Sequence, residues 1–484
     1  MPISWARPER AAPVAGIGFR LKRLIVEEGG TGWLRAHLYG AVLSAGPWLL
    51  SICTLGSLAL LSRDLIGDLA HARFQVIVVY TYTFSLVTTG AAHMVVTRQL
   101  ADELYVGRLG ALVVSYRVTI AATALAHLAL GTLVYSLAPG LEPALRLFGV
   151  MLLVVVSCTW MVMIYLGAAQ DYASVVTAFF LGNAVSLLGA LALGRYLGTS
   201  GYLAGFLVGQ AGIFFVLCAR VEREFSLVRV PESVDLTRAF VHYPELIAAG
   251  LLYNAAIAVD RVVFWIGPTG HPIVGWFRAS LYDSPIFLCY LSVVPALAIF
   301  LVSVETDFYD RYREYYGVAT KHGTLRQVLE AKRAMTACLR DSLRRLLVAQ
   351  APVTLLLMAL APWIADGLGL DRLQVSILRC GLVGAVLHVL CLFGGIVLLY
   401  FDRRRAAAEV AAVFLAANLL LTVATLVVGP RAYGLGYPLA ALLGCAWAYR
   451  RLEQTLADLE YLTFAAQPMV PEAPAVESSH PASA

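Results

Sequence analysis

Long apolar stretches, separated by short polar segments, dominate the chain. A membrane-spanning helix needs about 20 mostly apolar residues, and a window of that length predicts twelve spans. The spans lie near residues 34–62, 74–96, 111–136, 144–168, 174–194, 202–219, 241–266, 276–304, 346–365, 375–400, 407–429 and 435–449. The pattern therefore predicts an all-α polytopic membrane protein.

Basic residues are divided unequally between the two sides of these spans. If the N-terminus lies inside, the inside segments carry 25 of the 36 lysines and arginines, and the outside loops carry five. Lysine and arginine are retained preferentially in cytoplasmic loops. Both termini are therefore expected in the cytoplasm.

The inside segments include an N-terminal segment, 1–33, and a C-terminal tail, 450–484. The sequence GIGFRLKRL at 16–24 alternates apolar and basic residues, which is typical of an interfacial membrane anchor. The tail from about residue 467 has four prolines in 18 residues and no apolar periodicity. It is expected to be disordered.

The composition narrows the class of protein. The chain of 484 residues is 60% hydrophobic and 14% charged, whereas soluble domains are about 25% charged. This excludes a soluble enzyme, a disordered regulator and a disulfide-built secreted domain. The net charge is +5, but the basic residues are distributed over several inside segments, so the charge does not indicate nucleic-acid binding.

The sequence indicates transport rather than catalysis. The outside loops have at most 11 residues, which leaves no room for an outer catalytic domain. The eight cysteines include no CxxC pair, so neither a zinc nor a redox site is expected. No metal and no cofactor is predicted.

Two neighbouring spans, 241–266 and 276–304, carry charged residues at positions expected in the outer third of the membrane. These residues are Asp260, Arg261, Arg278 and Asp283. Charge inside a bilayer is costly, so it usually faces protein or a water-filled cavity. We interpret the group either as an outer gate or path mouth, or as an ion-pair cluster that locks the two helices.

An aromatic and acidic stripe is expected in span 276–304. Trp276, Asp283 and Tyr290 follow a seven-residue spacing, which places them on one face if the segment is helical. Aromatic rings stack on sugars and a carboxylate accepts their hydroxyls, so the stripe suits a carbohydrate. The alternative is an interfacial tryptophan and a packing tyrosine.

Other polar residues lie within the predicted spans. Tyr82, Thr89 and His93 belong to a polar stripe in span 74–96, which faces either a cavity or a neighbouring helix. Arg117 lies near the inner end of span 111–136 and either contributes to the path or snorkels to the interface. His388 is interpreted as an isolated core contact.

Three prolines are candidate hinges. Pro47 lies near the middle of the first span, and Pro285 and Pro295 lie in span 276–304. Proline removes a helical hydrogen bond, and broken helices are common at transporter binding sites. The alternative is a kink that only improves packing.

The longest polar segment, 305–345, predicts a basic amphipathic helix. Thr324 and Gln327 have the spacing of a capping box, and leucines follow at helical spacing. The basic residues are Arg326, Lys332, Arg333, Arg340 and Arg344. The helix is expected to lie on the anionic inner leaflet, to dock a cytosolic partner, or merely to extend into the next span.

Several blocks of the chain resemble a known family. They are GIGFRLKRL (16–24), SAGPW (44–48), DRVVFWIGP (260–268) and, most specifically, YDSPIFLCYLSVVPALAIFLVSVETDFYDRYREYY (282–316). They are similar to the Pel exopolysaccharide transporter family PelG, and the resemblance runs from about residue 16 to 460.

This resemblance implies the fold of the multidrug and polysaccharide exporter superfamily, with two six-helix lobes around a central cavity. The N-lobe would be 34–219, the linker 220–240 and the C-lobe 241–449. The resemblance also implies the bacterial inner membrane, an amino-sugar-rich polymer exported to the biofilm matrix, a cytosolic glycosyltransferase and a membrane-bound cyclic-di-GMP receptor as partners.

The favoured function is therefore polysaccharide export. The alternatives are a flippase for a lipid-linked oligosaccharide, an ion-coupled small-molecule antiporter with Asp260 or Asp283 as coupling site, and a scaffold that anchors a glycosyltransferase without transport. A lipid diphosphate would favour clustered basic residues. Those in the spans are dispersed, which favours the polymer.

Overall fold

The computed structural model describes residues 46–47, 49–58, 61, 67–169, 171–225, 236–321 and 323–465. The expectations for the N-terminal anchor and for the tail beyond 467 lie outside these residues, as does the middle of the linker, 226–235. Within the described part, nine helices are long and apolar enough to cross a membrane. The chain is thus a multi-pass membrane protein.

We call the first group of helices the N-lobe and the second the C-lobe, after the predicted division of the chain. The N-lobe consists of α3 (Asp68–Val106), α4 (Leu109–Ser136), α5 (Pro143–Ala168) and α6 (Tyr172–Glu224). Helix α6 is interrupted at Gly198, whose φ of 57° and ψ of −137° are not helical. Because a left-handed φ is accessible mainly to glycine, the chain reverses there into two packed arms. These arms match the predicted spans 174–194 and 202–219.

The second group forms the C-lobe. It begins with α7 (Leu236–His242), α8 (Pro244–Ile266), β1 (Gly270–Val274), β2 (Phe277–Ser280), α9 (Asp283–Ser292), α10 (Val294–Ser303), the π-helix η1 (Val304–Phe308) and α11 (Tyr309–Thr320). It continues with α12 (Leu325–Leu368), α13 (Arg372–Tyr400), α14 (Arg404–Val428), the 3₁₀ turn η2 (Pro430–Ala432), α15 (Gly436–Ala457) and α16 (Leu459–Phe464).

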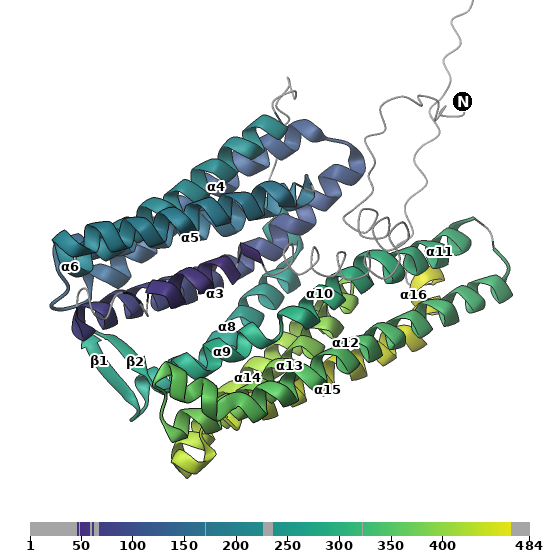
Figure 1. Ribbon diagram of the computed structural model, residues 1–484. Helices are drawn as coiled ribbons and strands as arrows, with labels where there is room; N and C mark the ends of the chain where they lie inside the picture. The colour runs from purple at the N-terminus through teal and green to yellow at the C-terminus, as the bar shows by residue number, and fades with distance from the viewer. Residues whose placement is uncertain are drawn as a thin grey trace, which may run out of the picture.

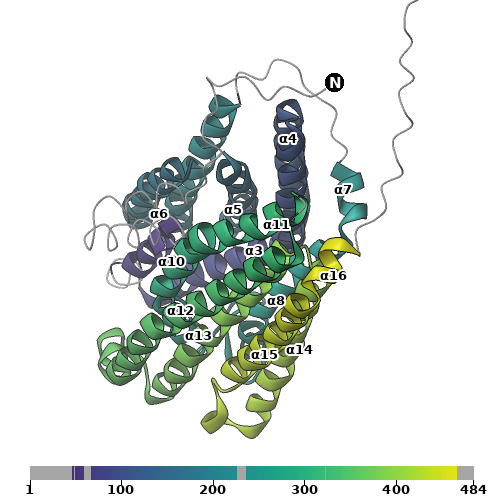
Figure 2. The same ribbon diagram turned by 90° about the vertical axis from the view of Figure 1, so that its right-hand side faces the viewer.

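The two lobes meet along α3 and α8. In Figure 1 the N-lobe helices form the upper group and the C-lobe helices the lower group, and α3 packs against α8 between them. Figure 2 shows α12, α13, α14 and α15 side by side in the C-lobe. The seam between the lobes therefore runs along one helix from each.

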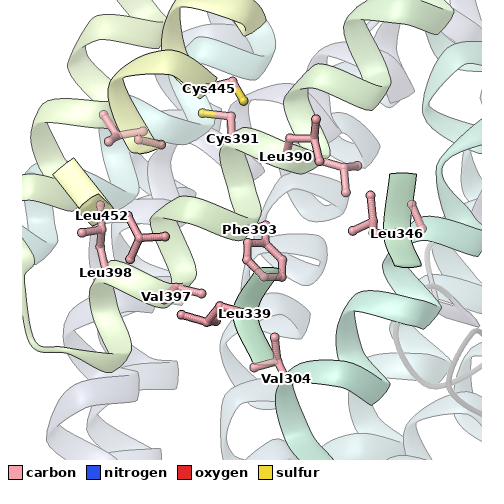
Figure 3. Packing of buried hydrophobic residues seen from close by; sticks show 14 of the residues in the cluster. Val304, Leu339, Leu346, Leu390, Cys391, Phe393, Val397, Leu398, Cys445 and Leu452 are labelled. Atoms are coloured by element: carbon pink, nitrogen blue, oxygen red, sulfur yellow. The ribbon is translucent and has the colours of Figure 1, made fainter. Parts of the chain in front are cut away.

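The C-lobe core extends toward the end where α11 and α12 project. Phe393 and Val397 of α13 pack with Leu339 of α12 and Val304 of η1, as Figure 3 shows. The thiols of Cys391 and Cys445 are buried and free. These contacts fix the α11–α12 hairpin to the bundle.

One predicted helical start is wrong. Residues 276–282 were expected to begin a span, but 270–280 form an antiparallel β-hairpin with Val274 opposite Phe277. Gly275 has a φ of 59° at its turn, as tight hairpin turns require. The flanking β-branched and aromatic residues favour strands. The helix begins only at Asp283.

The prolines of this segment differ in their effect. Pro285 is the third residue of α9, where a proline is compatible with a helix. Pro295 stands in the first turn of α10, just after the helix is interrupted at Val293. Pro47 lies in a described helical turn, and the hydroxyl of Ser51 donates to its carbonyl at 3.0 Å. Their role as hinges remains a prediction.

Candidate functional site

The seam between the lobes is tightest at two glycines. A Cβ on Gly90 of α3 would lie 2.7 Å from the carbonyl oxygen of Gly250 in α8, and one on Gly250 would lie 2.0 Å from the oxygen of Gly90. Small residues let membrane helices approach closely. The two lobes therefore cross here backbone to backbone.

The β-hairpin of the C-lobe docks on the N-lobe at one end of this seam. The phenol of Tyr80 in α3 accepts from the amide of Arg278 at 3.2 Å and donates to its carbonyl at 3.1 Å. The ring of Tyr80 stacks on Trp265 of α8, with centroids 4.0 Å apart. We call this set of interactions, with those of Trp276 and Phe277, the hairpin contact.

Two aromatic residues of the hairpin complete the contact. The indole of Trp276 donates to the carbonyl of Val134 in α4 at 3.2 Å, and its ring stacks on Phe277 at 4.3 Å. Phe277 is fully buried and lies 5.4 Å from the ring of Tyr135. A C-lobe element thus contacts α3 at Tyr80 and the C-terminal end of α4.

The predicted charged residues converge on this region, but their acids and bases do not pair. Asp283 accepts from the indole of Trp265, with both oxygens at 3.0 Å. Asp260, fully buried, accepts from the hydroxyl of Tyr282 at 2.9 Å. Both carboxylates therefore accept hydrogen bonds from uncharged groups. The interpretation of these four residues as an ion-pair cluster is thus wrong.

The two arginines of this group have other partners. The guanidinium of Arg261 lies 5.4 Å above the ring of Tyr290, and that of Arg278 donates to the carbonyl of Gly270 at 2.6 Å. Since Trp276 lies in the hairpin turn, it shares no helix face with Asp283. The expected stripe is thus reduced to Asp283 and Tyr290 of α9.

His388, interpreted from the sequence as a core polar contact, is buried within the C-lobe, but the sequence did not predict its partners. His388 of α13 shares hydrogen bonds with the hydroxyls of Tyr253 in α8 at 2.8 Å and of Tyr437 in α15 at 3.0 Å. The ring of Tyr290 lies 6.1 Å from that of Tyr437. Hydroxyls, an imidazole and a carboxylate therefore line the interior of this lobe next to the seam.

The other predicted residues take different places. Tyr82 donates to Gln210 of α6 at 3.1 Å, and Thr89 donates to the carbonyl of Ser85 at 2.6 Å, both inside the N-lobe. His93 is exposed on α3. Arg117 pairs with Glu222 at 3.0 Å between α4 and α6, away from the seam.

A second inter-lobe contact lies beyond the glycine crossing. Arg98 of α3 pairs with Asp102 at 3.2 Å and with Asp402, before α14, at 3.5 Å. The hydroxyl of Tyr243 donates to Asp102 at 2.8 Å, and Arg404 lies 4.8 Å above its ring. We call these residues the charged contact.

Two residues of the charged contact, Tyr243 and Asp402, show how it is held together. Burial and the bond to Asp102 raise the pKa of Tyr243, so its phenol remains a donor. Asp402 has a φ of 54°, a conformation that few non-glycine residues adopt. Its carboxylate also pairs with Arg404 at 3.0 Å. An aspartate with two ion pairs thus occupies a backbone conformation that is more usual for glycine.

The predicted basic helix is the N-terminal half of α12. Its capping box is present: the amide of Thr324 donates to Gln327 Oε1 at 2.8 Å, and the amide of Gln327 donates to Thr324 Oγ1 at 3.4 Å. Lys332 pairs with Glu460 of α16, and Arg326 with Glu330. The remaining arginines, Arg333, Arg340 and Arg344, are exposed.

Solved structures of low sequence identity share the fold. A mutant of the Vibrio cholerae MATE transporter VcmN is 14% identical, with a TM-score of 0.57 over 91% of this chain and 97% of that one. A MOP superfamily transporter from Pyrococcus furiosus is 12% identical, with a TM-score of 0.59 over 86% and 96%. The lipid II flippase MurJ is 11% identical, with a TM-score of 0.50 over 88% and 90%.

The sequence comparison is more specific. A search of curated proteins finds no significant relative. The profile of the exopolysaccharide exporters PelG (EPS-E), however, matches residues 14–464. Because this match covers nearly the whole chain, and the structure has the fold of MOP transporters, the protein belongs to the PelG family of exopolysaccharide exporters.

Proposed function

We propose that this chain moves a polysaccharide across the bacterial inner membrane, from the cytoplasm to the periplasm, as part of a synthase complex. Twelve spans with both termini in the cytoplasm fit this function. The nine long apolar helices include α6, whose two arms each have the length of a span. Helix α15 and the short apolar helix Leu49–Leu58 would account for the other two.

The observation that carries the proposal is the arrangement of contacts along the seam. On α3, Tyr80 is about 15 Å from Gly90 in one direction and Arg98 is about 12 Å from it in the other, at 1.5 Å per residue. The hairpin contact and the charged contact therefore lie on opposite sides of the glycine crossing. Rocking about this crossing would open one contact and keep the other closed.

The residues near the hairpin contact favour a sugar polymer with amino groups. Tyr80, Trp265 and Trp276 supply aromatic rings, and Asp283 supplies a carboxylate beside them. Among the described residues, Arg261 and Arg278 already engage Tyr290 and Gly270. Each of these arginines is held by an uncharged group, so the preference for a polymer rests on the aromatic rings and on Asp283.

A reversible cross-link tests whether the lobes must separate. A Cβ on Gly275 of the hairpin would lie 3.2 Å from the Cβ of Ala138, which follows α4, and 2.9 Å from the carbonyl oxygen of Pro139. A disulfide needs a Cβ separation of about 3.5–4.5 Å, so the turn must shift by a few tenths of an ångström to form it. The double variant Gly275→Cys with Ala138→Cys should secrete polymer when reduced and stop when oxidised. The single variants control for the side chain at the turn. Full secretion by oxidised, cross-linked protein would contradict transport by lobe motion and favour the scaffold.

We also propose that α12 docks the cytosolic glycosyltransferase of the complex. Helix α12 is continuous from Leu325 to Leu368, and apart from Leu325 at its start, its large exposed apolar residues begin at Leu347. Arg333 is about 21 Å from Leu347 along the helix, so this part projects away from the bilayer. An acidic protein surface fits the exposed arginines better than a lipid headgroup at that distance.

A further inference from the structure

The two arms of α6 leave a groove between them on the lipid-facing side of the N-lobe. Its volume is about 520 Å³, within the usual range of small-ligand sites. The walls include Leu181, Val185 and Val216, each about half exposed. Exposed apolar side chains in a membrane-spanning helix face lipid tails. The groove is therefore open to the hydrocarbon core.

Glycines shape the groove. Gly182 and Gly209 lie where the arms touch, since a Cβ on Gly182 would come within 2.9 Å of the Gly209 carbonyl oxygen. Gly212 lines the groove, and a Cβ there would meet nothing within 4 Å. A larger side chain at position 212 would therefore extend into the groove.

The groove is polar at one end only. There the guanidinium of Arg220 pairs with Asp171 at 3.1 Å and donates through Nε to the hydroxyl of Ser174 at 2.7 Å. The side chain of Arg220 remains 41% exposed, and a guanidinium has five N–H donors. Further donors are available at this mouth for an anion.

The length of the groove matches one leaflet. From Ser174 at the mouth to Val185 at the far end is about 16 Å along the helix. The hydrocarbon core of a bilayer is about 30 Å thick. The groove thus reaches from the membrane surface to about its midplane, the depth of a single acyl chain.

We propose that this groove binds one glycerophospholipid, with an acyl chain between the arms of α6 and its phosphate on Arg220. Guanidinium and phosphate form strong charge-assisted hydrogen bonds. In the proposed orientation the mouth lies on the cytoplasmic side, so the lipid comes from the inner leaflet. The inference rests on α6 alone and does not depend on what the protein exports.

Native mass spectrometry of the full chain in mild detergent tests the site, with phosphatidylglycerol as probe and diacylglycerol of the same chains as phosphate-free control. Wild type should retain one phosphatidylglycerol. Gly212→Leu fills the groove and Arg220→Gln removes the charge, and each should weaken binding about tenfold. Gly395→Leu is the matched control, because a Cβ at Gly395 in α13 also meets nothing within 4 Å.

The outcomes separate the sources of the lipid. Thr177 lines the groove from the opposite arm. If Gly212→Leu and Thr177→Trp both bind phosphatidylglycerol as well as wild type, the proposed site is wrong. Equal retention of diacylglycerol would also contradict it. Preferential binding of a polyprenyl phosphate would assign the groove to a carrier lipid instead and also overturn it. Thr177→Trp keeps the test valid if Gly212→Leu misfolds, and each melting temperature reports folding independently.

Discussion

The hydroxyl of Tyr80 bonds both backbone groups of Arg278, accepting at 3.2 Å and donating at 3.1 Å. This side chain of α3 therefore binds the hairpin of the C-lobe through its peptide backbone, in addition to the contacts of Trp276 and Phe277 with α4. The guanidinium of Arg278 is engaged elsewhere, by the carbonyl of Gly270. The contact thus depends on the tyrosine and the hairpin conformation rather than on the arginine side chain.

Tyr80→Phe should loosen the hairpin contact without removing its ring stack. The variant loses two hydrogen bonds, each worth about 0.5–1.5 kcal/mol, while the ring can still stack on Trp265. Amides of residues 270–280 should exchange with deuterium about tenfold faster. Tyr82→Phe is the control, because its hydroxyl bonds Gln210 within the N-lobe. Equal exchange in both variants would argue against an inter-lobe role for Tyr80.

Gly250→Ala should destabilise the crossing of α3 and α8. The new methyl group would lie 2.0 Å from the carbonyl oxygen of Gly90, so the helices must separate. Overpacking of this kind costs about 1–3 kcal/mol, and the melting temperature in detergent should fall by several degrees. Gly395→Ala, with open space around its Cβ, should melt like wild type. An unchanged melting temperature for Gly250→Ala would contradict the close crossing.

Most spans could be predicted because a bilayer imposes length and hydrophobicity on any helix that crosses it. The capping box of Thr324 and Gln327 could be predicted because it is a local interaction. The hairpin at 270–280 could not. The hydrophobicity averaged over a window of residues is the same whether Ile273, Val274 and Phe277 lie in a strand or in a helix.

The pairing within the site depends on tertiary structure. Asp260 and Arg261 are consecutive, so their side chains point in different directions from α8, and each meets a different tyrosine. His388 and Tyr253 are 135 positions apart. A lone histidine in an apolar helix has no periodic signal, so the polar group inside the C-lobe was visible only in the structure.

Asp283→Asn and Asp260→Asn should reduce secreted polymer several-fold while the protein still reaches the membrane. Each asparagine retains one acceptor oxygen for Trp265 or Tyr282, but the negative charge beside the proposed path is lost. Extracellular polymer and membrane protein should be measured in parallel. Asp68→Asn, at the exposed start of α3, is the control. Normal secretion by both variants would contradict a gate or path at this position.

Arg98→Gln should weaken the charged contact. It removes the ion pair to Asp402 at 3.5 Å, but the effect on the conformational equilibrium should not exceed about 1 kcal/mol, because the pair is partly exposed. Spin labels on the two lobes should show that the ratio of the two conformations changes by up to about fivefold. The same shift should appear in wild type at high salt. Arg108→Gln, which breaks a pair between the residue before α4 and Glu103 of α3 within the N-lobe, should leave the distances unchanged.

Charge reversal on α12 should weaken recovery of the glycosyltransferase. Arg333 and Arg340 are seven residues apart, so they lie on one exposed face, and glutamates there would repel an acidic partner surface. The double variant should co-purify with several-fold less enzyme and keep its membrane level. The matched control exchanges Arg326 and Glu330, which preserves an existing ion pair of 2.9 Å and the net charge. Unchanged recovery in the double variant, or equal loss in the control, would show that these arginines do not recognise the partner.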